Sequence, residues 1–205
     1  MTLLDDWSIS FSMSEDTKQK IIAVGADIIH RKGFNNTGIQ EILKACGVPK
    51  GSFYYYFESK EAFGVAVARY FSSRLGETAG PLLRDKSYTP LERLKNFFRF
   101  FRDYFEKQGW SRGCPIGNLA QEMGDLSGPL QLELSQIVNG MVRAIAPVIR
   151  EAADAGQISG TIDPERTAGF IVASWHGAIL QMKVHKCSAP LDNFEQIVFE
   201  NLLVR

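Results

Sequence analysis

The chain has 205 residues and a mass of 22.9 kDa, enough for one or two domains with a substantial core. Hydrophobic residues make up 45% and charged residues 22%, which is typical of globular proteins and excludes wholesale disorder. No apolar run reaches the ~20 residues of a membrane span, and the acidic start MTLLDD does not resemble a secretory signal. Three cysteines without a C-x-x-C pair form neither a disulfide framework nor a zinc motif. We therefore expect a cytoplasmic protein that needs no metal, cofactor or membrane.

The formal net charge is zero, but the charges are distributed unevenly along the chain. Residues 1–16 carry four acidic residues and no basic one, whereas residues 17–60 carry seven basic and three acidic residues. The remaining residues hold sixteen of each sign. A basic segment beside a neutral body is typical of a small nucleic-acid-binding domain on a larger scaffold, although many ordinary domains have a similar excess.

Apolar residues recur with the helical period of 3.6 throughout, and no segment alternates as a strand does. The pattern predicts an all-α protein with eight or nine helices and no sheet. We expect helices at residues 15–32, 37–45, 49–56, 60–83, 91–105, just after 115, 134–155, 164–182 and 191–204. Thr37, three residues before Gln40, has the spacing of a capping box, and Ser59 and Asp163 are expected N-caps. His30 is expected to be a solvated residue in the last turn of the first helix.

Residues 37–60, TGIQEILKACGVPKGSFYYYFESK, have the pattern of a helix-turn-helix. Two short helices flank a turn that contains Gly47, and Ile42 and Val48 are placed to pack them together. Phe53 and Phe57 are expected to face the core, and Cys46 to pack in the turn. The opposite face of the second helix carries lysine, serine and tyrosine side chains, which can donate hydrogen bonds to phosphate oxygens.

Residues 18–63 resemble the DNA-binding domain of TetR-family transcriptional regulators. The matching motifs are Gly-Phe at 33–34, A-x-G-V at 45–48, GSFYYYF at 51–57 and Ser-Lys-Glu at 59–61. The resemblance implies a homodimer that represses transcription by binding a palindromic operator in double-stranded DNA until an inducer releases it. It implies DNA contacts from Thr37, Lys50, Gly51, Ser52, Tyr54, Tyr55, Tyr56 and Lys60, with a tyrosine at position 56 where histidine is commoner.

The resemblance also suggests the domain organisation. An N-terminal tail would span residues 1–13, the helix-turn-helix DNA-binding domain residues 14–62, and a larger helical domain for ligand sensing and dimerisation residues 63–205.

GCPIGNL at 113–119, followed by Glu122 and Asp-Leu-Ser at 125–127, resembles the electrophile-sensing and acrylate-type subgroup of this family. The resemblance places a sensor cysteine at Cys114, close to a helix N-terminus that would favour its thiolate. Lys183 matches a basic residue of the subgroup and could lower the thiol pKa further. An apolar pocket walled by Trp110, Trp175, His176 and Phe101 would surround the thiol and admit a small molecule or an electrophile. In the alternative interpretation, Cys114 only packs and the inducer is a non-covalent apolar ligand.

Gly169, Ala173 and Gly177 recur every four residues on one expected helix, which allows close approach of a second helix. In the family the dimer is a four-helix bundle of the last two long helices, so this line is either the seam between subunits or a crossing within one chain. A competing hypothesis is a cysteine-dependent enzyme that pairs Cys114 with His176 or His185. No cysteine-hydrolase motif is present, and such an enzyme would leave the helix-turn-helix unexplained, so we expect no catalytic residues.

Overall fold

The structure is a computed structural model that describes residues 15–49 and 51–204. The expected tail at 1–13 and the expected DNA contact of Lys50 lie outside the described residues.

The described residues form helices and connecting turns, without any strand. The helices are α1 (Glu15–Lys32), α2 (Ile39–Cys46), α3 (Ser52–Tyr56), α4 (Lys60–Arg84), α5 (Pro90–Lys107), α6 (Pro115–Met123), α7 (Gly128–Asp154), α8 (Pro164–His185) and α9 (Ala189–Ile197), and a π-helical turn covers Val198–Leu202. The all-α prediction is confirmed, and within this part of the chain no helix is long and apolar enough to cross a membrane.

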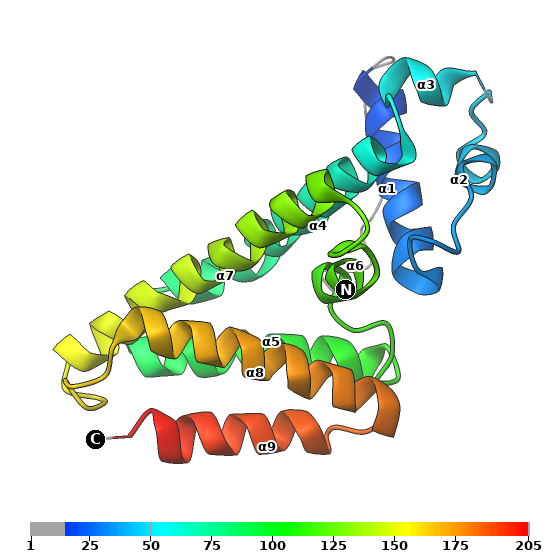
Figure 1. Ribbon diagram of the computed structural model, residues 1–205. Coiled ribbons are helices and arrows are strands. Elements are labelled where there is room, and N and C mark those ends of the chain that lie inside the picture. The colour runs from blue at the N-terminus through cyan, green and yellow to red at the C-terminus, as the bar shows by residue number, and fades with distance from the viewer. Residues whose placement is uncertain (1–14, 50, 205) are drawn as a thin grey trace.

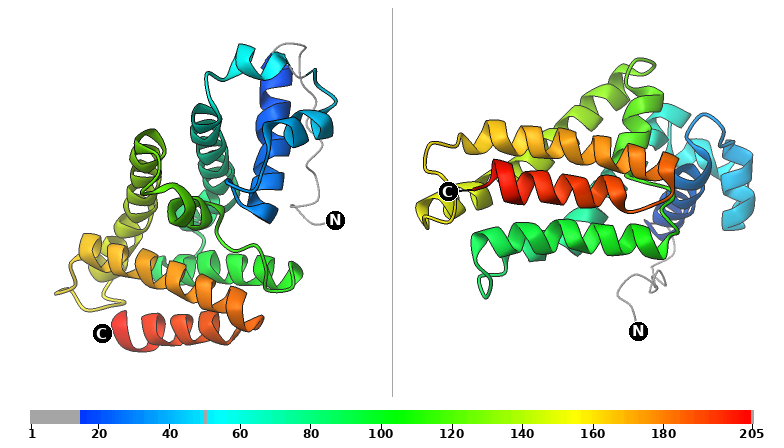
Figure 2. Two further views of the ribbon diagram at one scale, coloured as in Figure 1. Left: turned by 45° about the vertical axis from the view of Figure 1, so that its right-hand side comes forward. Right: turned by 90° about the horizontal axis from the view of Figure 1, so that it is seen from below.

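Two long helices, α4 and α7, lie side by side and connect the two ends of the molecule (Figure 1). Helices α1 to α3 gather at one end, and α5, α8 and α9 form a layer at the other (Figures 1 and 2). The short helix α6 lies between these two parts.

Buried apolar side chains form two clusters rather than one. The first includes residues of α1 to α3, the N-terminal half of α4, α6 and the N-terminal half of α7. The second includes the C-terminal ends of α4 and α7 together with α5, α8 and α9. Cys114 packs against both clusters. Helix α6 therefore shares a core with the helix-turn-helix, and the division at residues 62/63 stays a prediction.

Several helix starts follow the sequence. The Ser59 hydroxyl accepts a hydrogen bond from the Ala62 N–H at 3.0 Å, and the Asp163 carboxylate accepts one from the Arg166 N–H at 3.0 Å. The predicted capping box at Thr37 is wrong, because Gly38 is the N-cap and no side chain caps this helix. Helix α3 begins at Ser52, three residues after the predicted start.

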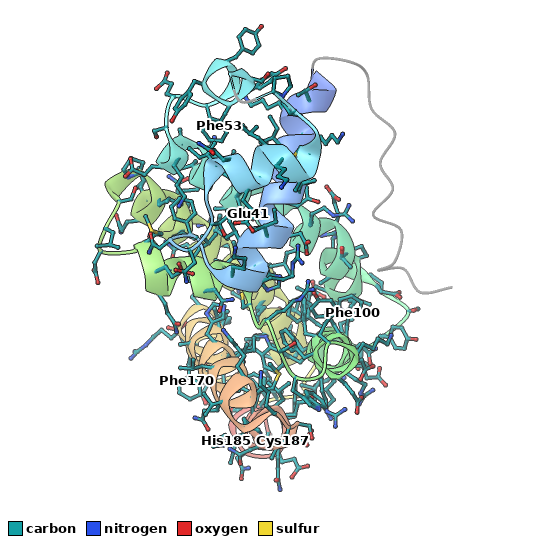
Figure 3. The ribbon with its side chains drawn as sticks, turned by 90° about the vertical axis from the view of Figure 1, so that its right-hand side faces the viewer. Glu41, Phe53, Phe100, Phe170, His185 and Cys187 are labelled. Carbon is teal, nitrogen blue, oxygen red and sulfur yellow. The ribbon has the colours of Figure 1, made fainter. Side chains whose placement is uncertain are left out.

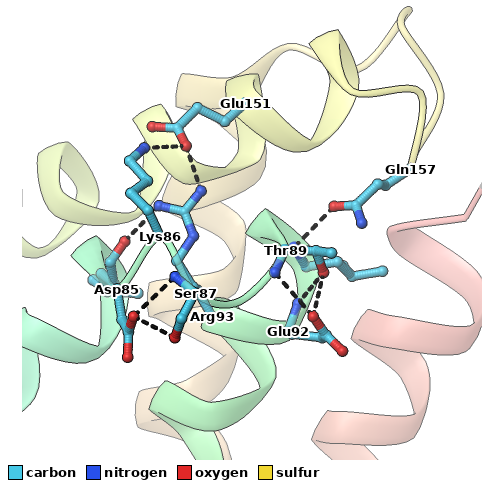
Figure 4. A network of polar contacts seen from close by, with 10 residues as sticks. Asp85, Lys86, Ser87, Thr89, Glu92, Arg93, Glu151 and Gln157 are labelled. Carbon is cyan, nitrogen blue, oxygen red and sulfur yellow. Dashed lines mark hydrogen bonds and ion pairs between the residues drawn. The ribbon is translucent and has the colours of Figure 1, made fainter.

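The turn between α4 and α5 is held by a polar network (Figure 4). Arg93 is only 2% exposed, donates a hydrogen bond to the Leu83 carbonyl at 2.9 Å, and pairs with Glu151 of α7. Lys86 donates to the same Glu151 carboxylate at 2.7 Å. A buried guanidinium needs such partners, since an unpaired one would be strongly destabilising. The network thus fixes α4, α5 and α7 relative to one another.

Candidate nucleic-acid interface and ligand cavity

Helices α2 and α3 form the predicted helix-turn-helix. Helix α2 ends at Gly47, whose φ of +66° lies in the left-handed region that glycine adopts without strain. Ile42, Phe53 and Phe57 are buried in the core shared with α1 and α4, as the sequence predicts. Cys46 is also buried, and the prediction that it packs in the turn is confirmed. This packing holds α3 by its apolar face and leaves its other face outward.

The outward face of α3 carries the tyrosines. Tyr54 and Tyr55 are 67% and 83% exposed, which is far more than folding requires of such large rings. Tyr56 is half-buried, and its ring packs edge-on against Tyr55 with centroids 4.9 Å apart. A Cβ on Gly51 would meet no atom within 4 Å, and its φ of −69° suits any residue. The fold itself therefore does not require a glycine at this exposed position.

Two other residues with expected DNA contacts, Thr37 and Lys60, lie outside the exposed face of α3. Thr37 is 1% exposed, and its hydroxyl donates to the Gly33 carbonyl at 2.7 Å. The Thr37 hydroxyl is thus engaged within the chain, and its DNA contact stays a prediction. The Lys60 ammonium lies over the ring of Phe34, 4.7 Å from its centre. Burial lowers the pKa of Lys60, while the nearby Glu122 carboxylate acts to raise it.

A cavity of about 1300 Å³ lies between α1, α4, α5, α7 and α8. Its lining is mainly apolar and includes eight aromatic side chains: Phe71, Phe97, Phe98, Phe100, Phe101, Tyr104, Phe105 and Trp175. Three expected pocket residues, Phe101, Trp175 and His176, line it together with Cys114. Trp110 instead packs against the outside of the same core, so its expected place in the wall is wrong. An aromatic cavity of this size suits a large apolar ligand.

Cys114 is the N-cap of α6, and its Sγ accepts a hydrogen bond from the Gly117 N–H at 3.5 Å. The sequence places it correctly at a helix N-terminus. Burial nevertheless raises the pKa of the Cys114 thiol, outweighing the Gly117 and Ile116 N–H groups and the positive charge of Lys183, which all act to lower it. The expectation of a favoured thiolate is therefore wrong, because desolvation of the charged form dominates.

Lys183 and His176 both lie beside this cysteine. The Lys183 ammonium donates to the Asn118 side-chain oxygen at 2.9 Å rather than to the sulfur. His176 is half-buried, and burial lowers its pKa, so its imidazole is neutral at pH 7. His185 lies at the exposed end of α8 and is not among the residues that line the cavity (Figure 3).

His30 of α1 contacts the segment around Cys114, and the sequence analysis does not predict this contact. His30 Nε2 lies 2.9 Å from the Gly113 carbonyl, and its ring packs edge-on against Phe71. Burial lowers the pKa of His30, so the expectation of a solvated residue is wrong. The next residue toward the N-terminus, Arg112, pairs with Asp27 of α1 at 3.3 Å.

A further contact ties the other end of α6 to the DNA-binding end of the molecule. The Glu122 carboxylate accepts a hydrogen bond from the Asn35 N–H at 3.1 Å, in the loop between α1 and α2. Polar contacts therefore hold both ends of the segment 112–122. Sequence spacing gives no sign of them, since their partners lie more than 80 positions apart.

The small residues of α8 face outward. Ala173 and Gly177 are exposed and Gly169 is half-buried, and a Cβ on either glycine would meet no atom within 4 Å. No helix of the part of the chain that the structure describes crosses this line closely. Phe170 (labelled in Figure 3) and Val184, 54% and 71% exposed, continue the same face together with Leu180. Their spacing of i, i+10 and i+14 forms a second apolar stripe that the sequence already contains.

Comparison with known proteins identifies the fold and the family. The profile described as "Bacterial regulatory proteins, tetR family" matches residues 21–67, and "Tetracyclin repressor-like, C-terminal domain" matches residues 90–198. The transcriptional repressor DhaR of Mycobacterium sp. (strain GP1) is 39% identical over 91% of this chain and 92% of its own length. The transcriptional regulator AcuR of Cereibacter sphaeroides is 35% identical over 91% of this chain and 85% of its own.

A solved structure has the same architecture. The reduced form of Escherichia coli NemR superposes with a TM-score of 0.84 at 27% identity, covering 93% of this chain and 97% of that one. Since the two profiles together span most of the chain and the relatives match it over nearly their whole length, the chain belongs to the TetR family of bacterial regulatory proteins.

Proposed function

We propose that this TetR-family transcriptional repressor binds a palindromic operator as a homodimer and leaves it when Cys114 reacts with an electrophile. The observation that carries the proposal is the position of Cys114: it caps α6, lines the aromatic cavity, and follows directly on the Arg112–Gly113 pair that contacts α1.

DNA binding is assigned to the exposed face of α3. Tyr54 and Tyr55 extend from this face and can donate hydroxyl hydrogen bonds to phosphates. Gly51 leaves room for the wall of the groove, since no atom of the described residues lies within 4 Å of the position of its missing Cβ. A palindrome requires two recognition helices at a fixed separation. The exposed apolar face of α8 supports a two-fold dimer that would provide this separation.

The sensing step is the addition of the thiol to an activated alkene. The Cys114 sulfur forms a bond to the β-carbon, the π electron pair moves to the α-carbon, and that carbon takes up a proton in place of the one lost from the thiol. The adduct adds atoms at the junction of the two apolar clusters. Overpacking of this kind typically costs about 1–3 kcal/mol, and moving α6 relieves it. Because α6 is bonded to α1 and to the α1–α2 loop, its movement changes the position of the helix-turn-helix.

A second candidate is release by a non-covalent apolar ligand in the same cavity. The size of the cavity and its aromatic walls favour this candidate, as does the raised pKa of the thiol. A third hypothesis, the cysteine-dependent enzyme, would use Cys114 with His176, and a turnover assay with acyl and thiol substrates tests it.

A gel-shift experiment separates the first two candidates. N-ethylmaleimide should release the wild-type protein from its operator, while Cys114→Ser should bind the operator and stay bound. Cys46→Ser and Cys187→Ser serve as matched controls and should respond like the wild type. Release of Cys114→Ser at the same dose would contradict thiol sensing and favour the non-covalent ligand.

A further inference from the structure

A second, smaller cavity of about 220 Å³ lies beside Cys114, between α6 and α8. It shares three residues with the large cavity: Cys114, His176 and Ile179. Cys114 thus lines both cavities.

The two cavities are both mainly apolar, but they present different side chains to Cys114. The large one contains eight aromatic side chains, whereas the small one places the polar groups of Asn118, Gln121 and Lys183 beside the thiol. The Lys183 ammonium has three N–H donors, and its hydrogen bond to Asn118 uses one of them. The ammonium can therefore donate to a carbonyl oxygen of a molecule held beside the thiol.

The cavities also differ in size. Water occupies about 30 Å³ per molecule in the liquid, so the small cavity has room for a compact molecule of roughly five to seven heavy atoms. This is below the range of about 300–1,000 Å³ that is usual for drug-sized ligands, whereas the large cavity exceeds that range.

Gly117 leaves the small cavity open. A Cβ at this position would lie 3.7 Å from the Cys114 Cβ and 3.9 Å from the His176 Cδ2, both ordinary contacts. An alanine would therefore fit without strain, and a longer side chain would extend into the cavity. Gly140 has the same relation to the large cavity, since its Cβ would meet only the Arg143 side chain, at 3.8 Å.

We propose that Cys114 is served by two separate sites: the small cavity binds a compact polar electrophile with a carbonyl oxygen and delivers it to the thiol, and the large cavity binds an apolar ligand reversibly. The proposal rests on Cys114 being the sensor and specifies which molecules reach it and from which side. The same protein would then respond both to a covalent inducer and to a non-covalent one.

Matched glycine substitutions test this proposal on the full-length protein. The reagent is iodoacetamide, with which the Cys114 sulfur forms a C–S bond as iodide leaves and the thiol proton passes to solvent. Mass spectrometry of the Cys114 peptide gives the alkylation rate. Fluorescence of the neutral probe N-phenyl-1-naphthylamine gives the affinity of the large cavity. Gly117→Leu places a side chain in the small cavity, Gly140→Leu places one in the large cavity, and Gly117→Ala is the control for the backbone.

Gly117→Leu should slow alkylation of Cys114 by at least about tenfold, a change equivalent to ~1.4 kcal/mol, and leave the probe affinity unchanged. Gly140→Leu should lower the probe affinity and leave the alkylation rate of Cys114 unchanged. Gly117→Ala should change neither quantity. If Gly117→Leu lowers the melting temperature, Ala120→Leu places a side chain in the same cavity from the next turn of α6.

An unchanged alkylation rate in Gly117→Leu, or equal slowing in Gly117→Leu and Gly140→Leu, would overturn the two-site proposal. Both measurements, the alkylation rate and the probe affinity, are made without DNA. A failure of the sensor hypothesis would appear separately, as an operator complex that survives complete alkylation of Cys114.

Discussion

Placing a charge on the exposed face of α8 gives the sharpest test of assembly. Ala173 lies on the face of α8 that carries Phe170, Leu180 and Val184, and its side chain is exposed in the single chain. Ala173→Glu therefore leaves the core of the monomer unchanged. In a two-fold dimer that buries this face, both copies of the glutamate would lie in the interface without a partner.

The cost can be estimated from the burial of unpaired charge. An uncompensated charge in an interface costs about 3–5 kcal/mol, and the two-fold axis doubles it to roughly 6–10 kcal/mol. At about 1.4 kcal/mol per factor of ten, the dimer dissociation constant should rise by at least about four orders of magnitude. Operator affinity should fall with it, because a monomer holds only one half-site.

Sedimentation velocity measures the change directly, and circular dichroism shows whether the helices persist. Gln131→Glu, at an exposed position near the start of α7, adds the same charge away from the stripe and should remain dimeric. An Ala173→Glu protein that sediments as a dimer at micromolar concentration and binds the operator normally would refute the assignment of this face to the dimer.

Three further predictions concern DNA, the thiol and stability. Tyr55→Phe should weaken operator binding by one to two orders of magnitude in an anisotropy titration. The reason is that a hydroxyl–phosphate hydrogen bond contributes about 1.5 kcal/mol in each of two half-sites. Unchanged operator affinity would show that Tyr55 does not contact the DNA. The rate of Cys114 alkylation should rise about tenfold per pH unit without levelling off below pH 9.0, because burial raises the thiol pKa above that ordinary value. The Lys183→Met variant should be alkylated more slowly than the wild type, since it lacks the positive charge that lowers this pKa. A rate that reaches a plateau below pH 8 would show an ionised thiol and contradict this prediction. Arg93→Met should lower the free energy of unfolding in urea by about 1–3 kcal/mol, because the Leu83 carbonyl loses its donor; a loss below about 0.5 kcal/mol would contradict this role of the network.

Local signals predict much of the fold. The first helix has the bounds expected from its periodicity and its following glycine, and Ser59 and Asp163 cap their helices as expected. Each of these features depends on residues within one turn of one another. The Thr37 capping box fails because the N-cap of α2 lies one residue later than expected, at Gly38, so that Thr37 lies outside the capping position.

The candidate site is harder to predict, because its properties arise from distant contacts. His30 is half-buried only because Gly113 and Phe71 pack against it, and neither partner is near it in sequence. The pKa of Cys114 depends on a desolvation that no helix-dipole argument includes. The second apolar stripe on α8, by contrast, is present in the sequence as the spacing of Phe170 and Val184. It can be recognised as an exposed apolar face once the structure shows that the opposite face of α8 is buried.

Reaction at Cys114 should release the protein from DNA, and a titration that records both events in the same samples tests this coupling. The wild-type protein, bound to a fluorescent duplex from upstream of its own gene, is titrated with N-ethylmaleimide. Anisotropy gives the released fraction, and peptide mass spectrometry of the same samples gives the modified fraction of Cys114. We predict that release rises in step with modification of Cys114 and is complete when Cys114 is fully modified. Release that precedes modification of Cys114, or an operator complex that persists after full modification, would contradict the account.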